Sequence, residues 1–398
     1  MTKEKVIPQI RFSGFTDTWE QRKLSAIADK VTEKNVGLQY IETFTNSAEF
    51  GIISQRDFFD HDIAKMSSLG GYYIVRSEDF VYNPRISTSA PVGPINRNKL
   101  GRIGVMSPLY TVFRPHDIDT TYLEYFFKSK YWHSFMNFNG DSGARSDRFS
   151  IKDSVFFEMP IPIPHIDEQK KIGEYLAYLD RLITLHQRKY DKLTKVKKAM
   201  LEKMFPENGS PYPEIRFKGF TDAWEQRKLG DTVQITMGQS PDGSTYSDVP
   251  SDYILVQGNA DLQNGWVSPR VWTSQMTKKA DAGDLIMSVR APAGAMGKTA
   301  YNAVIGRGVA AIKGNEFIYQ LLEKMDSDGY WKALSCGSTF ESLNSDNIKN
   351  ADVLIPDVAE QEKIGEYFLA IDRLITLHQR KLEKLKNIKK ACLEKMFV

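Results

Sequence analysis

Loop segments of the 398-residue sequence carry clustered arginine, asparagine and lysine residues beside glycine, serine and proline. Guanidinium groups pair with guanine acceptors and carboxamides pair with adenine, so such side chains could read base edges in a DNA groove. In the first half of the chain, the candidates are Asn83, Arg85, Arg97, Lys99, Arg102, Arg145 and Arg148. In the second half, they are Gln239, Ser240, Asn259, Arg290, Lys298, Arg307, Ser338 and Thr339. Any one of them alone is better explained as a solvated surface group, and only the clusters favour a nucleic-acid surface.

Sequence signatures of catalysis are largely absent. Tyr82–Arg85 reads YNPR and lacks the second proline and the aromatic residue of an amino-methyltransferase motif. Pro292–Thr299 resembles a phosphate-binding loop, but proline stands where the first glycine is needed. The six histidines show no zinc-ligand spacing, and two cysteines, Cys336 and Cys392, are too few for a cysteine-based zinc site. The sequence therefore predicts a chain that catalyses no reaction and holds no metal.

The overall charge is nearly balanced, with 53 Lys and Arg residues against 50 Asp and Glu residues. A nucleic-acid role would then depend on local basic patches, because the net charge of +3 supplies only a weak field. The N-terminal segment lacks the apolar core of a signal peptide, and no apolar run approaches the length of a membrane span. We therefore expect a soluble cytoplasmic protein.

Two segments that must position these residues occur twice. Ile10–Leu24 and Ile215–Leu229 are identical at 13 of 15 positions. Glu168–Lys189 and Glu360–Lys381 are identical at 17 of 22 positions. The intervening stretches, residues 30–150 and 235–340, barely resemble each other. A scaffold copied within one chain around two unlike inserts predicts two different recognition domains held by one repeated framework.

Each repeat ends in a long helical pattern, over Asp167–Phe205 and Ala359–Phe397, without proline. Apolar residues recur at steps of three and four, which is typical of a coiled-coil seam. In the first helix the seam is Ile172, Leu176, Leu179, Ile183, Tyr190, Leu193, Met200 and Met204. In the second it is Ile364, Phe368, Ile371, Ile375, Leu382, Leu385, Cys392 and Met396. A helix of about 38 residues is roughly 57 Å long. One turn of B-DNA is about 34 Å, so a spacer of this size can place two domains in major grooves on the same side of a duplex.

The two helices are expected to pair antiparallel about a pseudo-twofold axis, with one domain at each end. His186 and His378 stand at the midpoints of the two helices, so we expect both near that axis. A polar seam residue that fixes helix register is a simpler interpretation of each than catalysis.

The inserts combine short strand-like runs with one helical pattern each. Strands are expected near 71–75, 79–82, 109–113 and 284–289, and helices near 121–127 and 317–322. The aromatic pairs Tyr131–Trp132 and Tyr330–Trp331 follow those helices and are interpreted as core anchors rather than base-stacking platforms. The fold class is thus α+β: two globular α/β-mixed domains separated by two long antiparallel coiled-coil helices. The expected boundaries are 1–160 and 211–355 for the recognition domains, with 161–210 and 356–398 for the helical regions.

At these residues the chain resembles the specificity (S) subunit of type I restriction-modification systems. The resemblance rests on the duplicated layout, the repeated GFTD openings, Met237–Pro241, and the Glu-Gln-x-Lys-Ile entry to each helix. It implies two target recognition domains, each reading one half of an asymmetric bipartite site in double-stranded DNA. It also implies a non-catalytic chain without cofactors of its own. Two methyltransferase (M) subunits would use S-adenosylmethionine, and restriction (R) subunits would use ATP and magnesium.

The repeated segments would then be the docking surface for the M subunits. We expect exposed faces around Glu168–Tyr175 and Glu360–Tyr367, and the outer helix faces with Arg188 and Arg380, to serve this purpose. Two other classes remain open at the level of sequence. One is an interaction scaffold in which the coiled coil alone matters, and the other is a self-contained nuclease or methyltransferase. The bases recognised cannot be obtained from the sequence.

Overall fold

The computed structural model describes residues 7–60, 64–141, 147–207, 209–335 and 342–397. The chain divides into two compact units, formed by residues 1–185 with 382–398 and by residues 186–381. Two long helices, α5 (Ile166–Met204) and α10 (Val358–Lys395), each contribute to both units. The sequence pattern thus predicted the existence and the extent of both helices, to within two residues at each end.

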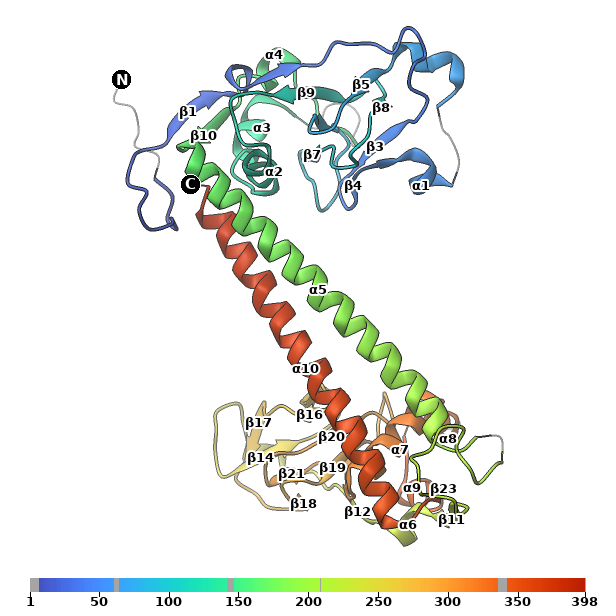
Figure 1. Ribbon diagram of the computed structural model, residues 1–398. Helices are drawn as coiled ribbons and strands as arrows, with labels where there is room; N and C mark the ends of the chain where they lie inside the picture. Colours follow the sequence, from blue (N-terminus) through green and yellow to red (C-terminus); the bar gives the residue numbers. More distant parts are fainter. Residues whose placement is uncertain (1–6, 61–63, 142–146, 208, 336–341, 398) are drawn as a thin grey trace. The chain divides into compact units, whose positions relative to one another are not determined.

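In the first unit, short antiparallel strands form a four-stranded sheet of order β2-β9-β6-β7 and the pairs β1-β10, β3-β4 and β5-β8 (Figure 1). The strands are β1 (Glu20–Lys23), β2 (Ala28–Lys30), β3 (Phe44–Ser47), β4 (Gly51–Ser54), β5 (Tyr73–Val75), β6 (Phe80–Tyr82), β7 (Ile95–Arg97), β8 (Gly104–Met106), β9 (Thr111–Pro115) and β10 (Pro160–Ile163). The helices are α1 (Gln55–Phe59), α2 (Thr120–Lys128), α3 (His133–Asn139) and α4 (Asp153–Phe156). The strands expected near 71–75, 79–82 and 109–113 correspond to β5, β6 and β9.

The core of the first unit lies between α2 and the four-stranded sheet. Asp119 caps α2 by accepting a hydrogen bond from the Tyr122 amide, which satisfies one of the free donors at the helix start. Trp132 is 2% exposed and packs in the same cluster, as expected of a core anchor. Met396 and Phe397, from the far end of the sequence, also belong to this cluster. Residues at both ends of the sequence thus complete one core.

The second unit contains a six-stranded sheet of order β12-β22-β19-β20-β16-β15 and a five-stranded sheet of order β13-β17-β14-β21-β18 (Figure 1). Its strands are β11 (Glu225–Lys228), β12 (Gln234–Met237), β13 (Tyr246–Ser247), β14 (Tyr253–Val256), β15 (Leu262–Gln263), β16 (Trp266–Val267), β17 (Val271–Thr273), β18 (Lys279–Ala280), β19 (Leu285–Ser288), β20 (Met296–Lys298), β21 (Ala303–Ile305), β22 (Val309–Lys313) and β23 (Asp352–Ile355). Its shorter helices are α6 (Leu229–Thr232), α7 (Glu316–Ser327), α8 (Tyr330–Ser335) and α9 (Ser345–Lys349). The helix expected near 317–322 is α7.

The core of the second unit repeats the arrangement around α7. Trp331 is fully buried in the same cluster as Phe317, which confirms it as the second tryptophan anchor. Phe205, directly after α5, and Phe368 of α10 pack in the same cluster. Both long helices therefore take part in this core as well.

The repeated segments meet inside each unit. β1 pairs with β10 and β11 pairs with β23, both antiparallel, which brings each opening segment to the start of the closing helix (Figure 1). Arg11 contacts both carboxylate oxygens of Glu168 at 2.7 and 2.8 Å, and Arg216 contacts those of Glu360 at 2.7 Å each. We call these the two closing ion pairs.

Glu168 and Glu360 have no exposed surface. The expectation that these two residues belong to an outward docking face is therefore wrong, because each carboxylate is used to hold its own unit together. Such fork-like pairing is the geometry in which arginine binds a carboxylate most specifically.

A glycine in each long helix allows close packing against a shorter helix of the same unit. A Cβ atom added at Gly173 would lie 3.1 Å from the Tyr122 amide nitrogen of α2. One added at Gly365 would lie 3.0 Å from the Glu316 Cβ of α7. Glycine in a helix interior lowers stability by roughly 0.5–1 kcal/mol relative to alanine. At these positions it permits the two helix backbones to approach, which explains the repeat.

The predicted seam residues of α5 and α10 are all buried or partly buried. At the midpoint, the Nδ1 atoms of His186 and His378 lie 2.7 Å apart. Burial and the nearby Lys381 and Lys189 lower the pKa of His186, and burial, His186 and the same lysines lower the pKa of His378. The pair is therefore neutral at pH 7, with one ring donating and the other accepting.

This histidine pair should make the stability of the second unit depend on pH. Because both folded-state pKa values lie below the ordinary value of 6.5, the unfolded chain binds protons more readily. The contribution of the neutral histidine pair to stability is complete above pH 6.5. It is lost as the pH falls through the lowered pKa values of the folded state. When the pH is lowered from 7.5 to 5.5, the melting temperature should fall less in the double variant His186→Gln/His378→Gln than in the wild-type chain. The exposed His116→Gln is the control; an equal decline in all three proteins would contradict the assignment.

Candidate nucleic-acid interface

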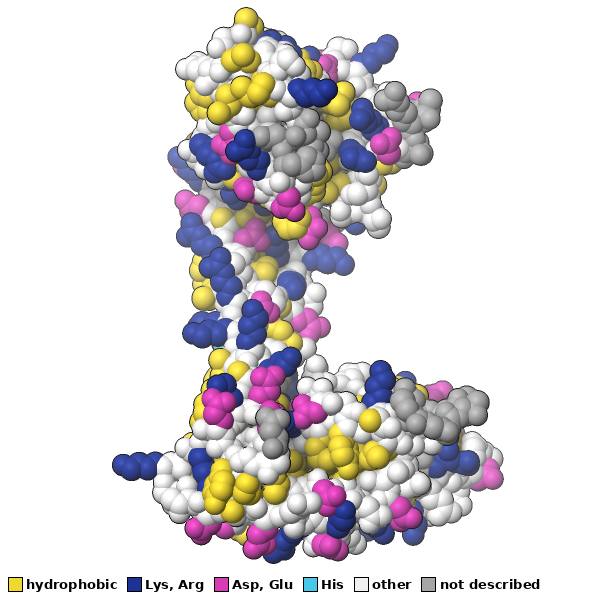
Figure 2. Space-filling model, turned by 90° about the vertical axis from the view of Figure 1, so that its right-hand side faces the viewer, with side chains coloured by type: hydrophobic (Ala, Val, Ile, Leu, Met, Phe, Trp, Pro, Cys, Tyr) yellow, Lys and Arg dark blue, Asp and Glu magenta, His cyan; other side chains and the backbone are white. Residues whose placement is uncertain are grey.

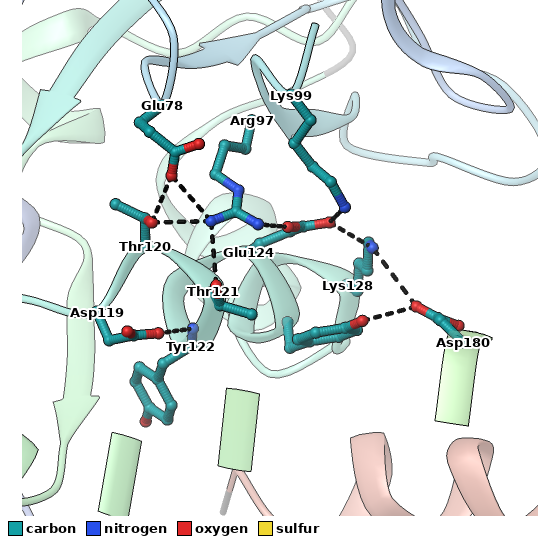
Figure 3. A network of polar contacts seen from close by, with 11 residues as sticks. Glu78, Arg97, Lys99, Asp119, Thr120, Thr121, Tyr122, Glu124, Lys128 and Asp180 are labelled. Carbon is teal, nitrogen blue, oxygen red and sulfur yellow. Dashed lines mark hydrogen bonds and ion pairs between the residues drawn. The ribbon is translucent and has the colours of Figure 1, made fainter. Parts of the chain in front are cut away.

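Arg97 and Lys99, two of the predicted DNA-contacting residues, belong to an internal network at the start of α2 (Figure 3). The Arg97 side chain is 9% exposed, and its guanidinium lies 2.6 Å from Glu124 and 3.0 Å from Glu78. The Lys99 ammonium lies 3.1 Å from Glu124. Although burial opposes ionisation, Lys128, Arg97 and Lys99 together lower the pKa of Glu124. Arg97 and Lys99 therefore neutralise a buried carboxylate of their own domain.

Arg102 and Asn83 are also engaged within the first domain. Arg102 donates two hydrogen bonds to Glu42, at 2.8 and 2.7 Å, and these lower the pKa of Glu42. The side-chain nitrogen of Asn83 donates to the Asn46 backbone carbonyl at 2.8 Å, and its side-chain oxygen accepts from the Arg85 backbone amide at 3.0 Å. Asn83 thus shapes the loop that carries Arg85.

Arg85 and Arg148 differ from those residues because neither guanidinium has an ion pair among the described residues. They are opposite partners in an isolated antiparallel bridge. The flanking bonds run from the Ile86 amide to the Asp147 carbonyl and from the Phe149 amide to the Pro84 carbonyl. This pattern defines a non-hydrogen-bonded pair, in which the two side chains lie close together on one face. Arg145 lies outside the described residues.

In the second unit, several predicted residues converge on one loop cluster. The Arg307 amide donates to the Ser240 hydroxyl at 3.2 Å, and the Gln239 amide donates to the Ile305 carbonyl at 2.9 Å. The Val289 amide donates to the Gly308 carbonyl at 2.9 Å, which brings the neighbouring Arg290 to the same loops. We define the glycine-packed loop cluster as residues 238–240, 257–259, 289–290 and 306–308. It contains Gln239, Ser240, Asn259, Arg290 and Arg307.

Glycines allow these loops to touch through their backbones. A Cβ atom added at Gly238 would lie 2.0 Å from the Gly306 carbonyl oxygen, and one added at Gly308 would lie 2.0 Å from the Gln257 carbonyl oxygen. This role of the glycines was not predicted from the sequence. Arg307 stands between two of them in the sequence, and that pattern could have indicated an arginine presented by tightly packed backbone.

Arg290 and Arg307 are exposed and have no ion pair within the parts of the chain that the structure describes. Lys298, by contrast, contacts both carboxylate oxygens of Glu316 at 2.7 and 2.6 Å, and its side chain is 12% exposed. Its ammonium also lies 4.0 Å from the centre of the Tyr319 ring. Ser338 and Thr339 fall outside the described residues. Of the cationic candidates here, Arg290 and Arg307 are available to a ligand without breaking an internal contact.

Replacing Gly308 with alanine should disrupt the loop cluster, because the new methyl group would overlap the Gln257 carbonyl. We expect a loss of about 1–3 kcal/mol in the free energy of unfolding, as for other overpacked sites. Gly258 provides a matched control: nothing lies within 4 Å of an added Cβ, and its φ of 177° suits any residue. Chemical denaturation of Gly308→Ala and Gly258→Ala measures the difference. Equal stability of the two variants would contradict the packing assigned to Gly308.

The segment that resembles a phosphate-binding loop has a different structure. Met296–Lys298 forms strand β20, whereas a phosphate-binding loop leads into a helix. Gly294 packs against Trp331. Across residues 7–60, 64–141, 147–207, 209–335 and 342–397, no three His, Cys, Asp or Glu side chains are grouped to hold a metal ion. None of the helices within these residues combines the length and the apolar character that a membrane span requires.

These features define the class of protein: two unlike domains, each presenting arginines free of internal ion pairs, on a framework repeated within the chain. Residues 17–195 and 221–387 match the family described as the type I restriction modification DNA specificity domain. The matches cover most of the sequence, and the chain belongs to this family. It is accordingly a DNA specificity subunit of a type I restriction-modification system and is not itself catalytic.

Similar proteins agree with this assignment over almost the whole chain. The putative type I restriction enzyme MjaX specificity subunit of Methanocaldococcus jannaschii is 25% identical, over 98% of this chain and 95% of the relative. The MjaVIII specificity subunit of the same organism is 23% identical, over 73% of each chain.

Among solved structures, the type I S subunit from M. genitalium has a TM-score of 0.65 at 14% identity, over 98% of this chain and 99% of that one. A chain from a structure concerning complex assembly and conformational transition of the type I R-M system has a TM-score of 0.52 at 19% identity, over 95% and 97%. At sequence identities of 14% and 19%, these two similarities show a shared fold.

Proposed function

We propose that each recognition domain reads one half of an asymmetric bipartite target in double-stranded DNA. The observation that carries this proposal is the division among the basic candidates. Arg97, Lys99, Arg102 and Lys298 are matched by carboxylates of their own domain. Arg85, Arg148, Arg290 and Arg307 are left without such partners among the described residues. Exposed or partly exposed arginines that lack internal partners can bind phosphates or guanine edges.

In the second domain, the proposed reading surface is the glycine-packed loop cluster. Its two arginines supply charge, and Gln239, Ser240 and Asn259 supply neutral hydrogen-bonding groups beside them. Arginine binds guanine O6 and N7, and carboxamides bind adenine N6 and N7. In the first domain, Arg85 and Arg148 supply the positive charge. The two surfaces differ in residues and in loops, so the two half-sites should differ in sequence.

We further propose that α5 and α10 pair antiparallel as a coiled coil that sets the distance between the half-sites. Support comes from each unit separately. In the first, Lys389 of α10 lies 2.5 Å from Asp180 of α5, and in the second, Lys197 of α5 lies 2.8 Å from Asp372 of α10. These equivalent contacts, together with the histidine pair at the midpoints, fit a pseudo-twofold arrangement. The division into recognition domains 1–160 and 211–355 and helical regions 161–210 and 356–398 belongs to the same proposal.

Two M subunits and the R subunits would dock on the repeated framework, and we propose the cytoplasm as the place of action. Lys171 and Lys363 occupy equivalent, exposed positions of α5 and α10 and lie over phenylalanine rings of the opening segments, Phe15 and Phe220. Lys and Arg side chains are spread along the exposed surface of the long helices (Figure 2). Identical exposed groups in both repeats suit identical partners. S-adenosylmethionine, ATP and magnesium would be bound by those partners.

The DNA-reading proposal is tested by selecting bound duplexes from a random pool with the full-length chain and its M subunits. We expect an asymmetric target with two conserved halves. Arg290→Ala and Arg307→Ala should each weaken binding by about 1–3 kcal/mol and relax specificity in one half only. Arg85→Ala and Arg148→Ala should act on the other half. Arg102→Ala is the matched control, since its charge is already compensated by Glu42.

The outcome separates this proposal from a scaffold without DNA affinity. Phosphate contacts make the logarithm of the binding constant fall steeply with the logarithm of salt concentration. If the complex selected no sequence, or if shuffling either half left the affinity unchanged, the proposal would fail.

For the docking surface, the double variant Arg188→Glu/Arg380→Glu should reduce co-purification of M subunits. Unchanged assembly would remove those two residues from the docking surface.

A further inference from the structure

The first recognition domain contains a surface cavity of about 430 Å³, beside Arg148. Four aromatic residues, Tyr73, Tyr82, Tyr110 and Phe149, are among those that line it. Tyr82 and Phe149 are 3% and 7% exposed, so they belong to the packed domain, whereas Tyr73 and Tyr110 are partly exposed. The volume lies within the range of about 300–1,000 Å³ that is usual for ligand sites. An aromatic lining of this kind suits a flat ring.

Polar groups are present in the same cavity. Thr111 donates a hydrogen bond to Asp153 at 3.1 Å, and Lys30 forms an ion pair with the same carboxylate. A carboxylate offers about four acceptor positions, and these two partners do not use them all. Asp153 can therefore accept a further hydrogen bond from an amino group, such as that of adenine or cytosine. The cavity combines aromatic walls with an acceptor and a cation.

One of the paired arginines belongs to the lining of this cavity. Arg148 lines it directly, and Arg85 is its opposite partner in the bridge. Like charges directly opposite each other on two strands destabilise the pairing. No carboxylate of the described residues relieves this repulsion by an ion pair with either arginine. An arrangement that is unfavourable in the free protein becomes favourable when an anion binds between the two guanidinium groups.

We propose that this cavity holds one nucleobase extruded from the DNA half-site read by the first domain, with the backbone phosphate bound by Arg85 and Arg148. The proposal rests on the DNA-reading function proposed above. An extruded base can stack on aromatic rings and expose its Watson–Crick edge to hydrogen bonding. Leu109, which lines the cavity and is 61% exposed, could fill the gap left in the base stack. Apolar side chains inserted between base steps act in this way in other DNA-binding proteins.

The experiment uses the full-length chain without M subunits, so that no methyltransferase site can extrude a base. The duplex carries the selected target, with 2-aminopurine placed at each position of the first half-site in turn. We expect a severalfold rise in fluorescence on binding at one position and little change at the others. Ser150→Phe, which places a ring on the cavity wall, should abolish that rise and weaken binding about tenfold.

Ser154→Phe is the matched control, because Ser154 is exposed, close in sequence and absent from the cavity lining. It should retain the fluorescence rise and the affinity, and equal melting temperatures would show that both variants fold. Sequence-specific binding without a rise at any position would overturn the pocket proposal alone. A rise that persists in Ser150→Phe would also overturn it. Absence of sequence-dependent binding by the wild-type chain, both alone and with its M subunits, would instead contradict the DNA-reading function on which it rests.

Discussion

Replacing Glu168 with alanine should lower the free energy of unfolding of the first unit by about 3–5 kcal/mol, the usual effect of removing one member of a buried ion pair. Glu168 accepts two hydrogen bonds from Arg11 and one from the Trp19 indole at 3.2 Å. The alanine variant would leave a guanidinium and an indole N–H without their acceptor. Hydrogen exchange measured by mass spectrometry, peptide by peptide, would assign the loss to the first unit.

The second repeat provides an internal comparison. Glu360 accepts two hydrogen bonds from Arg216, but the indole nitrogen of Trp224 has no hydrogen-bond partner. Glu360→Ala should therefore destabilise the second unit by less than Glu168→Ala destabilises the first. Glu20→Ala, at an exposed position of β1, is the control for loss of a surface charge. If either substitution lowered the protection from hydrogen exchange equally in both units, the closing ion pairs would not act locally.

Replacing residues 30–150 with the matching region of another family member should change one half of the recognised sequence completely and leave the other half intact. The exchanged region contains Arg85 and Arg148, whereas the glycine-packed loop cluster lies entirely in the second unit. Arg11, Trp19 and Glu168 remain outside the exchange, so the closing ion pair is preserved. Selection of bound duplexes with the chimaera and with the original chain provides the measurement.

A change in both halves, or in neither, would contradict the assignment of one half-site to each domain. The mirror exchange of residues 235–340 is the matched experiment and should alter only the second half. Because the two exchanges share the same framework, the gap between the half-sites should be the same in both chimaeras.

The repeated framework and its helices could be predicted from sequence because their signals are local or duplicated. The spacing of Ile172, Leu176 and Leu179 on α5 requires no knowledge of the partner, and all three are buried. Trp132 and Trp331 were predicted as anchors because each follows an amphipathic helix, and both are buried. Duplication added a second, independent copy of each pattern.

Whether an individual arginine forms an internal ion pair could not be predicted, because its partner lies far away in the sequence. Arg97 is neutralised by Glu124, and Arg102 by Glu42, whereas Arg85 has no such partner among the described residues. Nothing in the local sequence separates these cases. The burial of Glu168 was also missed, although its identity in both repeats, like that of Arg11, was a usable signal.

The composition of the first core has a consequence for the order in which the chain can fold during synthesis. The second unit is one continuous stretch, residues 186–381. The first unit needs Cys392, Met396 and Phe397, which pack with Tyr122 and its neighbours. A ribosome therefore delivers all of the second unit before it delivers the piece that finishes the first. The first unit therefore cannot complete its core until the whole of the second unit has been translated.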